Sequence, residues 1–236
     1  MDLYIVTGTS RGLGHALAGR LRATPQVRLV TIGRRDATII ADLATAEGAQ
    51  AASDAIARES AHGPYGKAVL FNNAGIVEPV GPLDEVDAAA LARNLNVNLV
   101  APMMLMRGFL QATSDVPLRR IVNISSGAGR RPIFGWGAYC AAKAGLDMAS
   151  RVAALEAEAR GQAVEVVSLA PGVIDTGMQA VVRGAPESAF RDVARFRALK
   201  EQGQLRSAED VAADILRLEA AGRLAGEPLR DLREMD

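Results

Sequence analysis

The sequence predicts an α/β fold in which a doubly wound parallel sheet of about seven strands is flanked by helices on both faces. Two observations lead to this prediction. Short runs rich in Val and Ile alternate with longer segments of helical periodicity. The runs are apolar throughout, as strands buried on both faces of a parallel sheet are. With 236 residues and no linker-like stretch, residues 1–236 are expected to form a single domain.

The apolar runs place the expected strands at residues 3–7, 27–32, 37–43, 67–73, 119–125 and 163–170. Between them, helices are expected near residues 12–23, 45–60, 84–113, 137–160 and 207–220. A last strand is expected at residues 228–232, although Pro228 cannot donate a hydrogen bond to a neighbouring strand. Residues 177–204 carry glycines and a proline around a charged helical pattern, and are predicted to leave the sheet as a lid over the site.

The charge and composition of the chain favour a small-molecule partner. Lys plus Arg equals Asp plus Glu at 27 each, so no overall positive field attracts nucleic acid or an anionic membrane. Cys140 is the only cysteine, and His15 and His62 form no cluster with metal-site spacing, so no metal is expected. The first apolar run, of about five residues, is too short for a signal peptide or a membrane span, and a cytoplasmic location is expected.

Residues 7–14, TGTSRGLG, join the first strand to the first helix. Glycines at Gly8, Gly12 and Gly14 leave backbone N–H groups free to face a pyrophosphate, which predicts a Rossmann-type dinucleotide site. The spacing differs from G-x-G-x-x-G, and the Lys and Ser/Thr of a triphosphate-binding loop are absent. A simple tight turn is the alternative, but the position at the first crossover of a parallel sheet favours the dinucleotide.

The end of the second strand indicates which dinucleotide binds. An NAD site has an acid about twenty residues after the glycine-rich turn, where it holds the ribose 2′-hydroxyl. This chain has Gly33 and Arg34 near that place, and an arginine can pair with a 2′-phosphate in bidentate geometry. Arg11 is expected to reach the same phosphate. NADPH is therefore predicted over NADH, although Asp36 lies close by and solvated surface arginines are the alternative.

Tyr139 and Lys143 stand four residues apart and share one face of an expected helix. A phenol has a pKa of about 10, and a nearby ammonium lowers it, so that the tyrosine can give a proton to a carbonyl oxygen. A half-buried tyrosine beside an extended lysine is the alternative. Ser126 favours the catalytic interpretation, because it lies thirteen residues earlier and follows a strand of the parallel sheet, where ligands bind.

These residues occur in an order that resembles the short-chain dehydrogenase/reductase family over nearly the whole chain. The matching features are TGTSRGLG at 7–14, NNAG at 72–75, Asn98, Ser126, YCAAK at 139–143 and PGVIDT at 171–176. The resemblance implies a catalytic tetrad of Asn98, Ser126, Tyr139 and Lys143. Ser126 would hydrogen-bond the substrate carbonyl, and Tyr139 would protonate it as hydride arrives from nicotinamide. Lys143 would hold the ribose and lower the pKa of the tyrosine, and Asn98 would position a water.

The same resemblance implies the cofactor contacts. For NADP(H) they are Gly8, Ser10, Arg11, Gly12, Leu13, Gly14, Arg34, Asp42, Leu43, Asn72, Ala74, Gly75, Tyr139, Lys143, Pro171, Gly172, Ile174 and Thr176. Asp42 and Leu43 would contact the adenine, and Ile174 and Thr176 the nicotinamide. Packing at a strand end is the alternative for these contacts. For the catalytic serine, Ser125 is the alternative, but the family's interval to the tyrosine selects its neighbour.

Within the family, the stretches at 41–48, 135–148, 171–179 and 195–205 are most similar to sepiapterin reductases and to bacterial and fungal reductases of benzil-type diketones. This similarity implies NADPH-dependent reduction of a vicinal dicarbonyl or an α-hydroxyketone. Sepiapterin reduction and a non-enzymatic NADP-binding sensor are the alternatives. Trp136, Met178 and Gln179 are expected to line the substrate pocket, with simple packing as the alternative for Trp136. Asp231 falls near the acid that holds the pterin in sepiapterin reductases, but out of clean register.

Family members commonly pair their two long helices, so a homodimer or homotetramer through residues 84–113 and 137–160 is expected. Apolar runs such as VAPMMLM at 100–106 permit this pairing, although the same residues could face the chain's own sheet.

Overall fold

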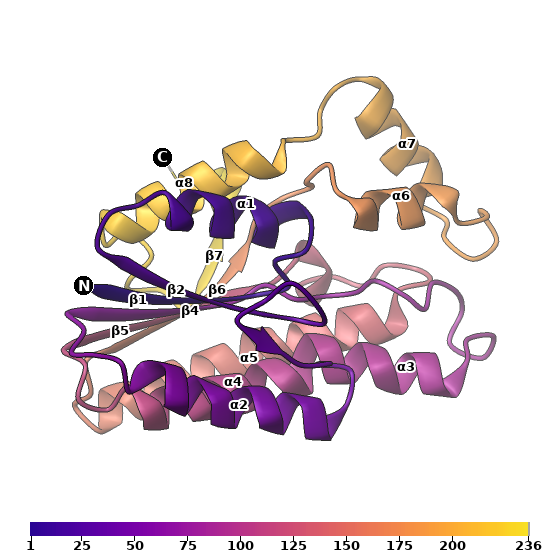
Figure 1. The fold of residues 1–236 in the computed structure, drawn as a ribbon. Coiled ribbons are helices and arrows are strands. Elements are labelled where there is room, and N and C mark those ends of the chain that lie inside the picture. The colour runs from indigo at the N-terminus through magenta and orange to yellow at the C-terminus, as the bar shows by residue number, and fades with distance from the viewer. Residues whose placement is uncertain (236) are drawn as a thin grey trace.

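A seven-stranded parallel sheet forms the centre of the protein, with helices on both faces (Figure 1). The computed structural model describes residues 1–235. The strands are β1 Asp2–Thr7, β2 Val27–Gly33, β3 Ile39–Ile40, β4 Lys67–Asn72, β5 Leu118–Ile124, β6 Val164–Ala170 and β7 Leu229–Asp231. Their order in the sheet is β3-β2-β1-β4-β5-β6-β7, and adjacent strands are parallel. The chain starts at the centre and winds outward in both directions, which confirms the predicted doubly wound α/β fold.

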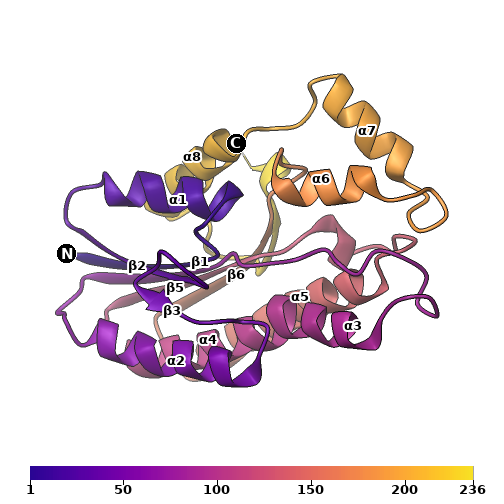
Figure 2. The same cartoon turned by 45° about the vertical axis from the view of Figure 1, so that its right-hand side comes forward.

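Two layers of helices enclose this sheet. The helices are α1 Gly12–Arg22, α2 Ala46–Ser60, α3 Ala88–Leu95, α4 Ala101–Ala112, α5 Gly137–Ala159, α6 Gly177–Gly184, α7 Val193–Glu201 and α8 Ala208–Ala220. One face of the sheet is covered by α2, α4 and α5, and the other by α1 and α8 (Figures 1 and 2). The segment at 177–204 forms α6 and α7, which follow the carboxyl end of β6 and lie apart from the two layers (Figure 2).

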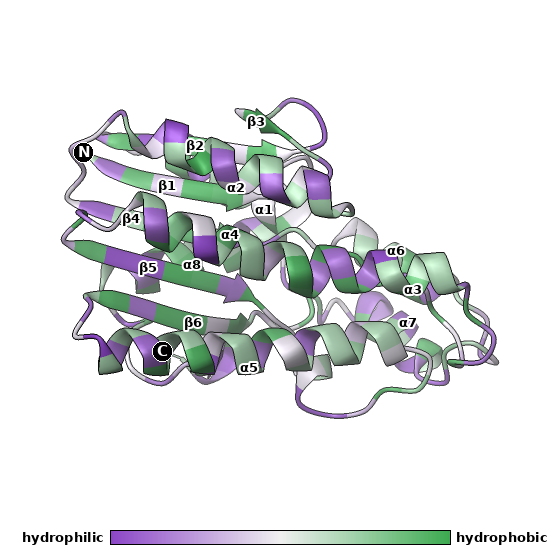
Figure 3. Cartoon of the chain, turned by 90° about the horizontal axis from the view of Figure 1, so that it is seen from below, coloured by the Kyte–Doolittle hydropathy of each residue, from purple (hydrophilic) through white to green (hydrophobic). Residues whose placement is uncertain are grey.

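The strands are buried on both sides, and their side chains point alternately to the two helical layers. In β1, Leu3 and Ile5 pack in the core beneath α2 and α4, whereas Tyr4 and Val6 pack in the core beneath α1 and α8. A strand in this position needs apolar residues throughout its length, and Figure 3 shows the mainly hydrophobic strands behind helices of mixed hydropathy. Burial on both faces explains why the strands appear in the sequence as continuous apolar runs, without alternation of polar and apolar residues.

The third strand is much shorter than the expected 37–43, because it spans only Ile39–Ile40. It lies at the edge of the sheet with β2 as its neighbour, and the side chain of Ile40 is 70% exposed. Just before it, Asp36 has a φ of +51°, and the backbone N–H of Thr38 donates to the hydroxyl of Thr31 at 2.9 Å. This turn takes up the residues that would have lengthened the strand.

The single long helix expected at 84–113 is divided. It begins at Ala88, where the Asp87 carboxylate accepts a hydrogen bond of 2.8 Å from the N–H of Ala90. Residues Asn96–Val100 form a π-helical turn between α3 and α4. Pro102 in the first turn of α4 cannot donate the usual bond to a carbonyl four residues earlier, and a π-helical turn at this point accommodates that loss.

The outer faces of α4 and α5 leave apolar side chains in solvent, among them Met103, Met148, Val152 and Leu155. Three of these lie on one stripe of α5, and such a stripe suits pairing with a second copy of the chain. The homodimer or homotetramer stays a prediction, which light scattering from the purified protein tests. Within residues 1–235, the structure contains no helix both long enough and apolar enough to cross a membrane.

A buried ion network joins α8 to the amino end of the sheet. The carboxylate of Glu219 accepts hydrogen bonds from Tyr4 Oη at 2.6 Å, Lys67 Nζ at 3.0 Å and Arg120 Nη1 at 2.6 Å. Removing one partner of a buried pair leaves the other charges without compensation.

We therefore expect Glu219→Ala to lower the free energy of unfolding by about 3–5 kcal/mol, measured by urea titration. The exposed Glu227→Ala should stay within about 0.5 kcal/mol of the parent. Equal effects of the two substitutions would contradict a structural role for the network.

Candidate active site

The carboxyl edge of the sheet brings together the residues expected to form the tetrad. Tyr139 and Lys143 lie in the first two turns of α5, and Ser126 is the second residue after β5. Asn98 lies in the π-helical turn before α4. Tyr139, Lys143 and Asn98 are buried, and Ser126 is partly buried. Because parallel strands end at one edge of the sheet, residues far apart in sequence meet here.

The phenol of Tyr139 is held in its protonated form. Burial raises its pKa to about 12, and the side-chain hydrogen bond with Ser126 acts in the opposite direction. The expected lowering of this pKa by Lys143 is not observed, because the Lys143 Nζ lies 5.7 Å from the centre of the tyrosine ring and burial dominates. A phenol that keeps its proton at neutral pH is suited to act as an acid toward a carbonyl oxygen.

Lys143 is anchored by its own polar contact to the end of β5. Its Nζ donates a hydrogen bond of 2.8 Å to the carbonyl oxygen of Ile124. Burial lowers its pKa to about 8, and the attraction of Asp147 acts in the opposite direction. The charge of this lysine therefore changes near neutral pH.

The two neighbouring serines after β5 have different partners. Ser125 is buried and its hydroxyl donates to Asp147 Oδ1 at 2.5 Å, so it is part of the protein interior. The hydroxyl of Ser126 accepts from the N–H of Ala128 at 3.1 Å and bonds to Tyr139. Of the two serines, Ser126 is thus the one that contacts the tyrosine.

The amide of Asn98 is fixed against the loop after β4. Its Nδ2 donates to Ile76 O at 2.8 Å, and its Oδ1 accepts from Ile76 N at 3.2 Å. A Cβ atom added to Gly75 would lie 2.9 Å from Asn98 Oδ1 and 3.9 Å from Lys143 Nζ. Gly75 therefore separates the side chains of Asn98 and Lys143 with almost no space for a side chain of its own.

The glycine-rich turn is locked to the end of β4. Thr7 Oγ1 accepts from the N–H groups of Asn73 and Ala74 at 2.9 and 2.8 Å, and Asn73 Nδ2 donates to Thr7 O at 2.8 Å. Gly8 has a φ of +71°, and a Cβ there would lie 2.8 Å from Ala74 Cα. Thr7 and Asn73 were not among the expected site residues, although both lie within the quoted motifs. The side chain of Asn72, which was, bonds to Asn123 Oδ1 at 2.8 Å in the interior.

The start of α1 fits a dinucleotide pyrophosphate. Arg11, the residue before the helix, makes no side-chain capping bond, and the first turn contains no acidic residue. The positive end of the helix is thus not neutralised by the chain's own side chains. Gly12 has a φ of +59°, and a Cβ there would lie 3.2 Å from Thr176 Cγ2, so the turn also meets the start of α6.

The residues expected around the adenosine half lie in the loops after β2 and β3. Arg34 and Asp42 are exposed, whereas Leu43 packs in the core. Arg11 lies toward α6, because a Cβ added to Gly177 would be 3.3 Å from its Nη1. Arg11 therefore lies beside α6, whereas Arg34 lies in the loop after β2.

The other expected cofactor residues are divided between surface and interior. Ser10 is exposed, Leu13 packs in the core beneath α1 and α8, and Pro171 is buried. Gly172 has a φ of +83°, and Ile174 pairs with Arg206.

An apolar cluster, which we call the lid cluster, joins Tyr139 to the segment at 177–204. Trp136 is 5% exposed and stacks on Phe190 with 4.8 Å between the ring centres. It also meets Phe196 at 5.6 Å and the edge of Tyr139 at 5.4 Å. The whole cluster consists of Val77, Ala128, Trp136, Tyr139, Val182, Ala185, Phe190, Val193 and Phe196, with Met178 packed against it.

The structure thus places Trp136, expected to line the substrate pocket, next to the tyrosine but covered by aromatic rings. Gln179 is buried in the neighbouring helix α6. Phe190 and Phe196 were missed by the sequence reasoning, although both are aromatic residues within the segment at 177–204.

Asp231 is occupied by a neighbouring side chain. Its carboxylate accepts hydrogen bonds from Arg233 Nε at 2.9 Å and Arg233 Nη2 at 2.5 Å, and this pairing lowers its pKa. A Cβ added to Gly172 would lie 3.4 Å from Arg233 Cδ, so the ion pair sits close to the loop after β6. The acid is near the predicted place but is not free to hold a ligand while this pair exists.

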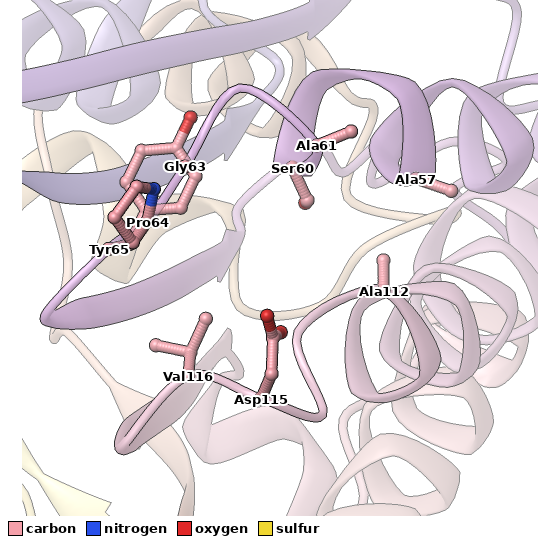
Figure 4. A pocket seen from close by; sticks show the side chains of 9 residues that line it. All are labelled: Ala57, Ser60, Ala61, Gly63, Pro64, Tyr65, Ala112, Asp115 and Val116. Atoms are coloured by element: carbon pink, nitrogen blue, oxygen red, sulfur yellow. The ribbon is translucent and has the colours of Figure 1, made fainter.

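A separate surface pocket of about 310 Å³ lies between the ends of α2 and α4, next to the loops that precede β4 and β5 (Figure 4). Tyr65 and Asp115 are its larger polar residues. These loops lie at the amino edge of the sheet, and the pocket shares no residue with the tetrad. Among residues 1–235, no group of three His, Cys, Asp or Glu side chains is arranged to hold a metal ion.

Comparison with known proteins identifies the family. A family model described as short chain dehydrogenase matches residues 3–186. The chain is 36% identical to a benzil reductase ((S)-benzoin forming) of Bacillus subtilis (strain 168), with 99% of each chain covered. It is 32% identical to sepiapterin reductase of Meriones unguiculatus, with 91% of this chain and 89% of the relative covered.

Solved structures agree with this assignment. The KRED1-Pglu enzyme superposes with a TM-score of 0.80 at 27% identity, covering 98% of this chain and 100% of the other. A structure from Beutenbergia cavernae with bound NADP has a TM-score of 0.76 at 28% identity, covering 98% and 94%. The chain therefore belongs to the short chain dehydrogenase family and is an oxidoreductase of that family.

Proposed function

We propose that the protein is an NADPH-dependent reductase that converts a ketone to an alcohol, with a vicinal dicarbonyl of the benzil type or an α-hydroxyketone as substrate. The observation that carries the proposal is the buried, protonated phenol of Tyr139, which is bonded to Ser126 and lies beside an apolar aromatic cluster. Such a group can protonate a carbonyl oxygen in a setting that excludes water.

A reduced nicotinamide dinucleotide bound at the glycine-rich turn would supply the hydride that reduces the carbonyl carbon. The Ser126 hydroxyl holds the carbonyl oxygen in hydrogen-bonding distance of Tyr139, and the Tyr139 hydroxyl gives that oxygen its proton. Lys143, anchored by Ile124 O, provides the positive charge that stabilises the phenolate left after this proton transfer. Asn98 keeps the loop after β4 in place beside Lys143.

The benzil-type substrate is supported by two observations. The relatives named benzil reductase are 36% identical to this chain, against 32% for the Meriones sepiapterin reductase. Asp231, near the place of the pterin-holding acid, is paired with Arg233.

We expect the purified protein to oxidise NADPH faster than NADH in the presence of benzil, and to turn over sepiapterin more slowly than benzil. Nicotinamide absorbance measures both comparisons, and diacetyl serves as the aliphatic diketone. Turnover of sepiapterin alone would assign the chain to pterin reduction instead. No turnover of any of the three carbonyl compounds would contradict the proposed reaction.

A further inference from the structure

Helix α5 carries a third polar residue on the face of Tyr139 and Lys143. Asp147 follows Lys143 by four residues, so the three side chains lie one above another along the helix. Each of them meets one of three consecutive residues at the end of β5. Tyr139 bonds to Ser126, Lys143 Nζ donates to Ile124 O at 2.8 Å, and Asp147 accepts from Ser125.

The carboxylate of Asp147 is buried and almost fully used. Its Oδ1 accepts hydroxyl bonds from Ser125 at 2.5 Å and from Ser168 at 2.6 Å. Its Oδ2 faces Arg130 Nε at 3.4 Å, and Arg130 Nη2 also donates to Arg230 O at 2.9 Å. Because Ser125 follows β5 and Ser168 lies in β6, the carboxylate connects α5 directly to the ends of these two strands, and it reaches Arg230 in β7 through Arg130. Such a network costs free energy unless every member is satisfied.

Asp147 is the nearest acidic residue on the helix that can offset the positive charge of Lys143. The other two lysines, Lys67 and Lys200, form ion pairs with acidic side chains, and within residues 1–235 no ion pair of Lys143 occurs. The attraction of Asp147 is the effect that opposes the burial of Lys143.

The other groups near Lys143 are neutral, whereas Asp147 also faces a positive group. Lys143 is near Tyr139, which is protonated, and across Gly75 it is near the neutral amide of Asn98. The positive group facing Asp147 is the guanidinium of Arg130, whose side chain is 31% exposed and which also feels the charge of Asp231.

We propose that Asp147 is a positioning residue for Lys143: a buried carboxylate that holds α5 against the ends of β5 and β6 and supplies the negative charge that keeps the Lys143 ammonium protonated. Asp147 contacts no reacting atom and acts through the lysine. The catalytic consequence rests on the proposed reductase function. The charge of Lys143 can be measured without turnover, so the role of Asp147 and the proposed function are tested separately.

The sign of the effect follows from the position of the charge. A lysine ammonium is present below its pKa, here about 8, and is lost as the pH rises through that value. Removing the negative charge of Asp147 lowers this pKa further, so the lysine becomes neutral at a lower pH. We expect Asp147→Asn to move the midpoint of the Lys143 titration down by about one unit, a tenfold change in proton affinity.

The chain contains only three lysines, which makes this midpoint directly measurable. Protein labelled with a carbon isotope at lysine Cε should give three side-chain signals by NMR, and Lys200→Arg identifies one of them. The titration is compared between the parent and Asp147→Asn. Glu219→Gln is the matched control, because Glu219 is another buried carboxylate but bonds to Lys67 instead of Lys143. In the control the Lys67 signal should move and the Lys143 signal should stay.

Two further variants separate charge from packing. Ser168→Ala removes one hydrogen bond to Asp147 but keeps its charge, so the Lys143 midpoint should stay within a few tenths of a unit of the parent. Arg130→Gln removes the competing positive charge, so the Lys143 midpoint should rise. If Asp147→Asn fails to fold, the upward shift in Arg130→Gln still tests the proposal, and its absence overturns it.

In catalysis, the alkaline fall of kcat/KM for benzil should begin at a lower pH in Asp147→Asn, while the acidic side of the profile keeps its position. A loss by the same factor at every pH, with an unchanged Lys143 titration, would show a purely structural role and overturn the proposal. Absence of turnover in the parent would refute the proposed function alone, because the lysine titration would still decide the role of Asp147.

Discussion

Replacing Tyr139 with phenylalanine is expected to lower kcat/KM for benzil reduction by about 10²–10⁴-fold. The change removes the hydroxyl that bonds to Ser126 and that donates the proton in the proposed mechanism. It leaves the ring in place against Trp136. The chain's single tryptophan lies 5.4 Å from that ring, so its fluorescence shows whether the site is still folded and still binds NADPH.

The matched control is Tyr65→Phe, which removes another buried phenol hydroxyl, in the pocket at the opposite edge of the sheet. It should keep kcat/KM within about a factor of two of the parent. Unchanged turnover in Tyr139→Phe would exclude this tyrosine as the acid and bring the non-enzymatic alternative back. Because the pKa of Tyr139 is about 12, the phenol stays protonated throughout the usual assay range. We therefore expect activity to fall at alkaline pH with the titration of Lys143, whose pKa is about 8, rather than with that of Tyr139.

Replacing Arg34 with glutamate is expected to lower kcat/KM for NADPH by about 100-fold and to leave the value for NADH nearly unchanged or raised. Arg34 is exposed in the loop after β2, the place from which a 2′-phosphate is recognised. A charge-assisted hydrogen bond contributes about 1.5–3 kcal/mol, and every 1.4 kcal/mol is about a tenfold change. A glutamate adds repulsion of the phosphate and offers an acceptor to the ribose 2′-hydroxyl.

The control for Arg34 is Arg22→Glu, which makes the same change in net charge in the last turn of α1, at the exposed end away from the glycine-rich turn. It should affect both cofactors equally and weakly. Steady-state kinetics with both cofactors, at fixed ionic strength, measure the ratio. If Arg34→Glu reduces the values for NADPH and NADH by the same factor, the arginine does not select the phosphate.

Much of the fold could be predicted because its elements are encoded locally. The strand expected at 163–170 is Val164–Ala170, and the helix expected at 137–160 is Gly137–Ala159. In each case the spacing of the apolar residues matches the faces that the segment buries against the neighbouring layers. The order of motifs along the chain was enough to predict the tetrad residues, and the structure brings them together at the edge where the parallel strands end.

Elements at the margins of the sheet could not be predicted in the same way. The strand expected at 37–43 was too long, because the length of an edge strand depends on how many residues the preceding turn takes up. The π-helical turn at Asn96–Val100 has the same apolar pattern as an ordinary helix. Its hydrogen bonding depends on Pro102 and on the loop that Asn98 contacts.

The sequence by itself determined the layers of the fold and the family, and it predicted the residues of the tetrad, because these depend on local periodicity and on the order of motifs. The tertiary structure decided which groups are free to act. Ser125 is taken by Asp147, Trp136 is covered by Phe190, and Asp231 is neutralised by Arg233. Local patterns encode which residues form a strand or a helix, but a contact such as that between Tyr4 and Glu219, 215 residues apart, exists only after the chain has folded. The same holds for the link between Asp147 and the ends of β5 and β6, because burial and partners are properties of the assembled layers.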